Sequence, residues 1–141
     1  MTEDFAYTVS AQAHYDAAHF LPNYEGKCSR LHGHRYVVEA ALQTTDLDDS
    51  GIAFDFIDLK NELRGIADGL DHENLNELRQ FQDVETSAEN QAKYFFEELS
   101  RRLPKSMVKG LLYARIWESP TQWAQYGPAS APMPPPQSPS G

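Results

Sequence analysis

The sequence predicts an α+β fold in which an antiparallel sheet of four strands carries two helices on one face. Two observations predict it. Stretches in which apolar and polar residues alternate stand near both ends of the chain, and two stretches with three- and four-residue apolar spacing lie between them. The expected order is therefore ββααββ. Because neither helix connects two successive strands, an antiparallel sheet is favoured over a doubly wound parallel one.

The first two strands are expected in the N-terminal third of the chain. From Phe5 to Ala17, residues of one parity are apolar or aromatic and the others are mostly polar, which is typical of a half-buried strand. The turn-like segment 22–27 follows. A second alternation then runs from Tyr36 to Leu42 and predicts the second strand.

Two amphipathic helices are expected next. After a possible cap at Asp55, apolar residues recur every three or four positions over 56–70. Thr86 and Glu89 have the spacing of a capping box, and the apolar stripe of the second helix covers 88–103. A proline follows that stripe and ends the helix.

The C-terminal part is predicted to return to strand and then to lose structure. Residues 112–118 alternate, and 123–126 are suited to a short last strand. Segment 127–141 is rich in proline, lacks charged residues and contains little that a core could bury, so we expect a disordered tail. The expected domain organisation is a single catalytic domain, 1–126, followed by that tail.

Composition narrows the possible functions. The 141 residues carry 12 Lys and Arg against 21 Asp and Glu, and the resulting formal charge of −9 argues against binding to nucleic acid or to an anionic membrane. The single cysteine, Cys28, excludes an internal disulfide and a thiolate-rich zinc site, and it fits a reducing compartment. No stretch reaches membrane-spanning length and the N-terminus does not resemble a signal peptide. We expect a cytoplasmic protein.

Three histidines are candidate metal ligands. His32 and His34 stand two residues apart, continue the apolar face of the second strand and flank a glycine. His19 continues the apolar face of the first strand, whereas His14 has the opposite parity and should point away. Three neutral imidazoles with an open fourth position are the ligand set of a catalytic zinc, so Zn²⁺ is the expected cofactor.

Cys28 lies four residues before His32, and its role is open. Near a cation or an imidazole, its thiol can titrate close to neutral pH and serve as a base or a nucleophile. Alternatively, it is a small buried hydrophobe, or it completes the zinc tetrahedron in the resting protein and leaves when substrate arrives.

Two further groups are candidates for catalysis and binding. Asp71 and His72 are adjacent in a predicted loop, and a carboxylate can orient an imidazole and raise its basicity. Glu118 shares a strand face that is otherwise apolar. It either meets two adjacent N–H donors of a ligand or reaches water at the end of its strand.

Together these motifs resemble the 6-pyruvoyltetrahydropterin synthase family, and most closely its bacterial branch, the 6-carboxy-5,6,7,8-tetrahydropterin synthases of queuosine biosynthesis. The likeness extends over roughly 5–126. The motifs that carry it are Ala17-Ala18-His19, Cys28-Ser-Arg-Leu-His32-Gly-His34, Asp55-Phe56 with Leu59-Lys60, Leu70-Asp71-His72 with Asn74-Leu75-Asn76, Ala88-Glu89-Asn90, and Trp117-Glu118.

The resemblance implies a tunnelling fold whose trimers pair as homo-hexamers, with active sites between subunits. The implied reaction converts 7,8-dihydroneopterin triphosphate to 6-carboxy-5,6,7,8-tetrahydropterin, acetaldehyde and triphosphate. The residues that match the zinc ligands are His19, His32 and His34. By the same resemblance, Cys28 matches the catalytic cysteine, Asp71 and His72 its dyad, and Glu118 the anchor of the pterin ring.

Two local features bear on substrate binding. At the start of the second helix Ser87 stands where the family has threonine, which affects the ring contacts expected there. A triphosphate must also approach an acidic protein, and Lys27, Arg30 and Arg35 flank the proposed site and could make it locally positive.

Three alternatives remain open. The sister activity, 6-pyruvoyltetrahydropterin synthesis, eliminates only triphosphate, and the four-residue interval from Cys28 to His32 favours the carboxy branch by analogy with the family. A non-catalytic zinc protein would close a structural tetrahedron with the same histidines and Cys28. A zinc hydrolase would leave Glu118 without a role.

Overall fold

A computed structural model of the chain describes residues 5–129. Its strands form one sheet in the order β3-β1-β2-β4-β5. The strands are β1 (Tyr7–His19), β2 (His32–Thr44), β3 (Glu73–Asn74), β4 (Leu111–Ser119) and β5 (Gln122–Tyr126). The α-helices are α1 (Phe56–Asp68), α2 (Ala88–Arg102) and α3 (Lys105–Val108), and short 3₁₀ helices are η1 (Lys27–Ser29), η2 (Leu75–Glu77) and η3 (Arg79–Phe81).

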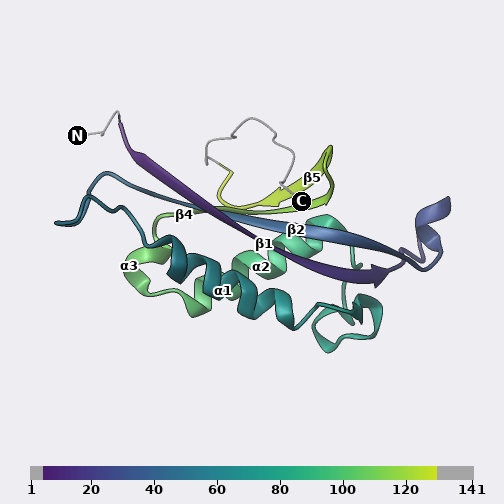
Figure 1. Ribbon diagram of the computed structural model, residues 1–141. Helices are drawn as coiled ribbons and strands as arrows, with labels where there is room; N and C mark the ends of the chain where they lie inside the picture. The colour runs from purple at the N-terminus through teal and green to yellow at the C-terminus, as the bar shows by residue number, and fades with distance from the viewer. Residues whose placement is uncertain (1–4, 130–141) are drawn as a thin grey trace.

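The helices cover one face of the sheet, as predicted. Figure 1 shows α1 and α2 below the long pair β1 and β2, with β4 and β5 continuing the sheet behind them. The core lies between these layers and includes Tyr15, Tyr36, Leu63 and Phe95, all 0% exposed. The predicted α+β class is therefore confirmed.

The predicted four-stranded antiparallel sheet is wrong. In the described part of the chain the sheet has five strands and is mixed, because β3 pairs in parallel with Ala17 and Ala18 of β1. A two-residue strand has no periodicity to detect, and only its tertiary partner makes it a strand. A third helix, α3, was also not expected; it follows Pro104, which is its N-cap.

The cap of α1 was predicted correctly and the cap of α2 was not. Asp55 is the N-cap of α1, and its side chain accepts a hydrogen bond from the backbone N–H of Ile57. At α2 the N-cap is Ser87, whose hydroxyl accepts from the N–H of Asn90, so Thr86 is not the cap. Thr86 is instead 1% exposed and faces the candidate site.

A β-bulge shifts the face of β4 at its start. Between Ala41 and Leu42 the register with β4 shifts, so that Leu42 pairs with Leu111. Leu111 consequently belongs to the core, and Leu112, which the alternation assigned to the buried face, is only half-buried. After the bulge Ala114 and Ile116 are buried as expected, but Tyr113, Arg115 and Trp117 on the other face are buried as well.

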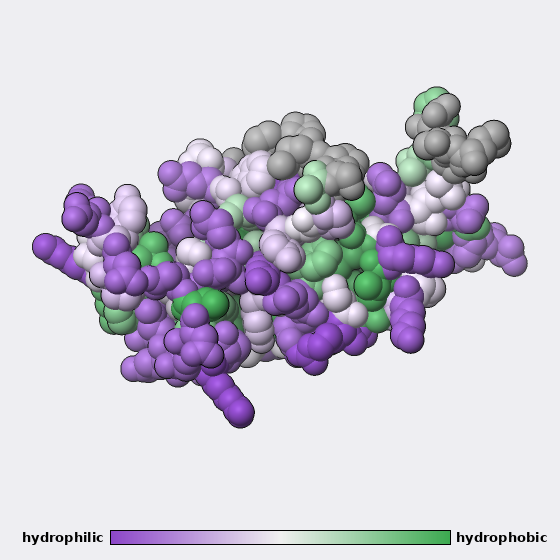
Figure 2. Space-filling view, turned by 180° about the vertical axis from the view of Figure 1, so that it is seen from behind, coloured by the Kyte–Doolittle hydropathy of each residue, from purple (hydrophilic) through white to green (hydrophobic). Residues whose placement is uncertain are grey.

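The surface is not uniformly polar. Figure 2 shows a largely hydrophilic face that also carries a hydrophobic area. Phe56 and Ile57, in the first turn of α1, are 57% and 68% exposed, although the helical spacing placed Phe56 in the buried stripe. Among residues 5–129, no helix is both long and apolar enough to cross a membrane. The predicted disordered tail lies outside the described residues from 130 onward.

Candidate metal centre

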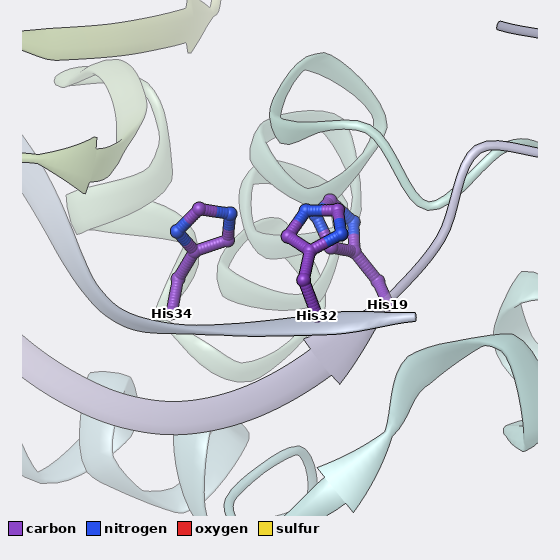
Figure 3. A group of neighbouring side chains, drawn as sticks. All are labelled: His19, His32 and His34. Atoms are coloured by element: carbon purple, nitrogen blue, oxygen red, sulfur yellow. The ribbon is translucent and has the colours of Figure 1, made fainter. Parts of the chain in front are cut away.

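The pairing of β1 with β2 brings the three candidate histidines together. His19 pairs directly with His32, and His34 pairs with Ala17, so all three imidazoles leave the same face at one end of the hairpin. Figure 3 shows the rings standing on the same side of the two strands. Each ring offers one nitrogen that lies within 4.8 Å of the others. The cluster could therefore bind a metal ion, and the parity of the two strands predicted the convergence.

Backbone carbonyls determine which nitrogen of His19 and His32 is free. The Nδ1 atom of His19 lies 2.7 Å from the carbonyl oxygen of Thr86, and Nδ1 of His32 lies 2.6 Å from that of Arg30. A carbonyl oxygen only accepts, so each Nδ1 carries the proton and each Nε2 keeps its lone pair. This is the outer-shell arrangement that orients metal-ligating histidines.

Two of the ring nitrogens that face the cluster lack a hydrogen-bond partner among residues 5–129. Nε2 of His19 and Nε2 of His34 are buried and make no hydrogen bond to the described residues. Buried polar atoms are almost always paired, so two orphaned nitrogens beside each other indicate a missing ligand. A metal ion with an affinity for imidazole fits both atoms.

Burial keeps two of the imidazoles neutral. It lowers the pKa of His19 below 6.5, and the Thr86 carbonyl and the Glu118 carboxylate oppose this only in part. Burial also lowers the pKa of His34, again against the opposing effect of Glu118. At neutral pH both nitrogens can therefore donate a lone pair to a metal.

Glu118 lies at the edge of the histidine cluster. Its Oε1 is 3.8 Å from Nε2 of His34, and its side chain is 27% exposed. The carboxylate is thus beside the candidate metal position and still open to solvent. It can accept hydrogen bonds from a ligand that lies across the cluster.

Cys28 lies in η1, in the loop between β1 and β2, and its thiol is free and half-buried. Its carbonyl accepts from the N–H of Leu21 at 2.7 Å, which ties the loop back to the end of β1. Among the described residues, the ligand atoms within 4.8 Å of one another come from the three histidines without Cys28. The thiol is therefore not one of the clustered ligand atoms.

Asp71 and His72 form a pair at the outer edge of β1. Nδ1 of His72 is 2.9 Å from Oδ2 of Asp71, and Oδ1 of Asp71 accepts from the backbone N–H of Asp16 at 2.8 Å. These bonds lower the pKa of Asp71. His72 has φ of +61°, a left-handed conformation that is uncommon outside glycine, and its N–H donates to the Asp16 carbonyl.

The pair does not join the histidine cluster within the described part of this chain; it groups with Asp16. An open depression of about 510 Å³ is nevertheless lined by both His34 and His72. Arg35 also lines it, but its guanidinium makes a bidentate ion pair with Asp16 at 2.8 and 2.9 Å. Its charge is therefore already matched.

The residues that support His19 were not predicted. The Thr86 carbonyl also accepts from Nε2 of Gln91 at 3.0 Å, and the Thr86 hydroxyl donates to Oδ1 of Asn76 at 3.0 Å. Asn76 in turn holds both the N–H and the carbonyl of Phe20, the residue after His19. Asn76 was part of a family motif, but its partner at 20 is apparent only from the fold.

Comparisons with known proteins agree with this arrangement. A model of the family "6-pyruvoyl tetrahydropterin synthase" matches residues 8–129. The chain is 32% identical over 130 residues to the 6-carboxy-5,6,7,8-tetrahydropterin synthase of Bacillus subtilis, covering 88% of this chain and 87% of that protein. It is 35% identical over 118 residues to the protein of that name from Synechocystis, covering 79% and 86%.

A solved structure is similar over nearly the whole chain. The structure of Caenorhabditis elegans 6-pyruvoyl tetrahydropterin synthase matches with a TM-score of 0.80 and 28% sequence identity, covering 92% of this chain and all of that one. The family match spans most of the chain and includes all three clustered histidines, Cys28 and Glu118. The chain therefore belongs to the 6-pyruvoyl tetrahydropterin synthase family.

Proposed function

We propose that this protein is a zinc-dependent lyase that converts 7,8-dihydroneopterin triphosphate to 6-carboxy-5,6,7,8-tetrahydropterin, acetaldehyde and triphosphate in queuosine biosynthesis. The observation that carries the proposal is the cluster of His19, His32 and His34, with orphaned Nε2 atoms and the Glu118 carboxylate 3.8 Å from His34. The bacterial relatives named 6-carboxy-5,6,7,8-tetrahydropterin synthase support the choice of product.

Zinc fits the donor set best. Three imidazoles without a thiolate or carboxylate among the clustered ligand atoms leave a fourth position for substrate, as in catalytic zinc sites. When bound, zinc would act as a Lewis acid towards the hydroxyl oxygens of the substrate side chain. The ligands would be the clustered ring nitrogens of His19, His32 and His34. For His19 and His34, Nε2 is the nitrogen without a hydrogen-bond partner among the described residues.

The remaining residues would bind the substrate and move protons. Glu118 would accept two hydrogen bonds from the amino group and adjacent N–H of the pterin ring. Cys28 as thiolate would take the proton from the side-chain carbon, and Asp71 would orient His72 as the second acid or base. The Ser87 hydroxyl accepts from Asn90, so its own proton remains available for a ring contact.

We propose further that the active unit is a homo-hexamer made of two trimers. The edge of β1 supports an oligomer, because within the described residues β3 is the strand that pairs with it and reaches only Ala17 and Ala18. The His72 side chain is 79% exposed at the same edge and would reach a neighbouring subunit in such an assembly. A reduced Cys28 thiol fits a cytoplasmic location.

One experiment separates the two pterin outcomes. Purified zinc-loaded protein is incubated with 7,8-dihydroneopterin triphosphate, the pterin product is identified by mass, and acetaldehyde is assayed. Formation of 6-carboxy-5,6,7,8-tetrahydropterin with acetaldehyde is the expected result. The pyruvoyl product without acetaldehyde would assign the sister activity, which the name of the C. elegans structural relative favours.

A Cys28→Ala variant is the matched control for chemistry. It should retain the fold and the metal, because Cys28 is half-buried and outside the group of clustered ligand atoms, but lose the lyase reaction. Loss of zinc in this variant would favour a structural tetrahedron that includes Cys28. If Cys28→Ala consumed the triphosphate substrate as fast as the wild type, the result would favour a hydrolase that uses metal-bound water over the proposed lyase.

A further inference from the structure

A third buried polar atom at the histidine cluster lacks a hydrogen-bond partner among the described residues. Tyr36 is 0% exposed, and its hydroxyl makes no hydrogen bond to any residue that the structure describes. Buried hydroxyls are normally paired, and an unpaired one is costly to keep. Phenylalanine would fill the same space without that cost, so the hydroxyl requires an explanation.

The neighbouring tyrosine shows how this core satisfies a hydroxyl. Tyr15 is the cross-strand partner of Tyr36, their rings stack at 5.1 Å, and both side chains are 0% exposed. The Tyr15 hydroxyl donates to Oε1 of Gln91 at 2.6 Å, and Nε2 of Gln91 donates to the Thr86 carbonyl. Gln91 lies near Tyr36 and opposes the rise in its pKa that burial causes, but its own hydrogen bonds are made with Tyr15 and Thr86.

The Tyr36 ring stands beside the groups proposed to bind substrate. Its centroid is 5.3 Å from that of His34 and 5.8 Å from that of His19. On its other side, β2 pairs Val37 with Trp117 of β4, so Tyr36 and Glu118 stand at neighbouring positions of the two strands. The Tyr36 side chain therefore lies between two candidate metal ligands and the strand position of the proposed ring anchor.

We propose that Tyr36 is a substrate-binding residue whose hydroxyl donates a hydrogen bond to the pterin ring. This inference rests on the proposed function. If Glu118 holds the amino end of the ring and the metal holds the side chain on C6, the C4 carbonyl and N5 lie between them on one edge. Both are acceptors, and within the described residues Tyr36 is the buried donor left without an acceptor there.

The hydrogen bond should matter more for the reaction than for binding. The change from a 7,8-dihydro to a 5,6,7,8-tetrahydro ring adds one hydrogen at N5 and one at C6, and electron density reaches N5 when the side-chain carbon loses its proton. A donor directed at N5 is strengthened as that charge develops. Tyr36 would donate the hydrogen bond and keep its own proton.

The test compares Tyr36→Phe with Tyr15→Phe in the zinc-loaded protein. The measurements are unfolding by denaturant, zinc content, the Kd for 7,8-dihydroneopterin, and kcat and KM with the triphosphate. We expect Tyr36→Phe to keep its zinc and be at least as stable as the wild type, to bind 7,8-dihydroneopterin about 2- to 12-fold more weakly, and to lose more in kcat than in KM. Tyr15→Phe should lose stability, because Gln91 loses its donor, and keep the wild-type Kd.

Two results would overturn the inference while leaving the proposed function intact: wild-type Kd and kcat in Tyr36→Phe, or a loss of stability showing that the hydroxyl has a partner inside the protein. If the wild type neither binds 7,8-dihydroneopterin nor converts its triphosphate, the proposed function fails, and the role of Tyr36 fails with it. The behaviour of the wild type therefore distinguishes the two failures.

Discussion

His19 and His32 each owe their orientation to a backbone carbonyl, at Thr86 and Arg30. Each candidate metal ligand can therefore be tested by substituting one histidine at a time. We expect His32→Ala to lose metal affinity by more than the roughly 10- to 100-fold that losing an outer-shell partner costs. Zinc per chain after dialysis, and the Kd from a chelator competition, measure this.

His14 is the matched control for this substitution. It lies on the same β1 strand as His19 but is exposed on the opposite face, so His14→Ala should bind zinc like the wild type. Equal zinc affinity in His32→Ala and the wild type would show that the metal binds elsewhere. A comparable loss in both variants would show that the effect is not local to the cluster.

The buried imidazoles also make the metal-free protein sensitive to pH. Because the folded pKa of His19 and of His34 lies below 6.5, the folded state binds fewer protons than the unfolded state. Their stabilising contribution is complete above pH 6.5 and is lost as pH falls through the lowered values. The free energy of unfolding of the metal-free protein should therefore decline from about pH 6.5 downwards, as denaturant titrations at several pH values would show.

The control for this decline removes one of the imidazoles. His34→Asn should decline less between pH 6.5 and 5 than the wild type does. The carboxyls of Asp16 and Asp71 are a separate source of acid sensitivity, but their pKa values lie below 3.8, outside this window. An identical slope in the variant would contradict the assignment of the effect to the histidine cluster.

At the scale of elements, the N-terminus of α2 combines a structural and a proposed binding role in Ser87. Removing its hydroxyl in Ser87→Ala should cost about 1 kcal/mol of stability through the lost cap. If the hydroxyl also contacts the ring, KM for the triphosphate substrate should rise several-fold. Asp55→Ala removes the equivalent cap of α1 and should cost a similar free energy without changing KM. The same KM in both variants would leave Ser87 as a cap alone.

Some helices and strands could be predicted from the sequence and others could not. The long strands, α1 and α2 were predictable because each has a periodic apolar face of many residues. The strand β3 has two residues and exists through its pairing with Ala17 and Ala18. The bulge at the start of β4 changes the parity of Leu111 and Leu112, and nothing in the alternation marks the extra residue.

The candidate site shows the same division. Strand parity predicts the convergence of the histidines, because local spacing and one antiparallel pairing are enough to place them. The Thr86 carbonyl contacts His19 although the two residues are 67 positions apart, and the Asn76 amide contacts Phe20 at a separation of 56. No local sequence pattern reveals contacts between such distant positions. Tyr36 begins the alternation of the second strand like any apolar-face residue, and only its orphaned hydroxyl distinguishes it.

At the scale of the whole molecule, the open edge of β1 predicts how assembly can be disrupted. The N–H of Asp16 donates to Asp71 and its carbonyl accepts from His72, so both groups point away from β2. Every second residue of β1 directs its backbone groups to the same side, and Ser10 is one of these residues. Proline at such an edge position is tolerated within one chain but removes a donor needed by a neighbouring strand. Ser10→Pro should remain folded and form smaller assemblies than the wild type by light scattering.

Ser10→Ala is the matched control, because it alters the same exposed side chain and keeps the N–H. It should retain the wild-type mass. Because the active sites are proposed to lie between subunits, Ser10→Pro should also lose activity in proportion to the loss of the large assembly. A fully active Ser10→Pro monomer would contradict both the interface at this edge and the need for it.

Removal of the metal distinguishes a catalytic site from a structural one. The core between sheet and helices is formed by apolar side chains such as Leu63 and Phe95, with the histidines at one end of the hairpin, so the fold does not depend on the metal for its core. Chelation should therefore abolish turnover, leave the far-UV circular dichroism spectrum unchanged and lower Tm only by the linkage expected for a lost ligand. Zinc added back should restore turnover. A chain that unfolds on chelation and refolds only with zinc would instead identify the metal as structural, because binding would then supply the folding free energy itself.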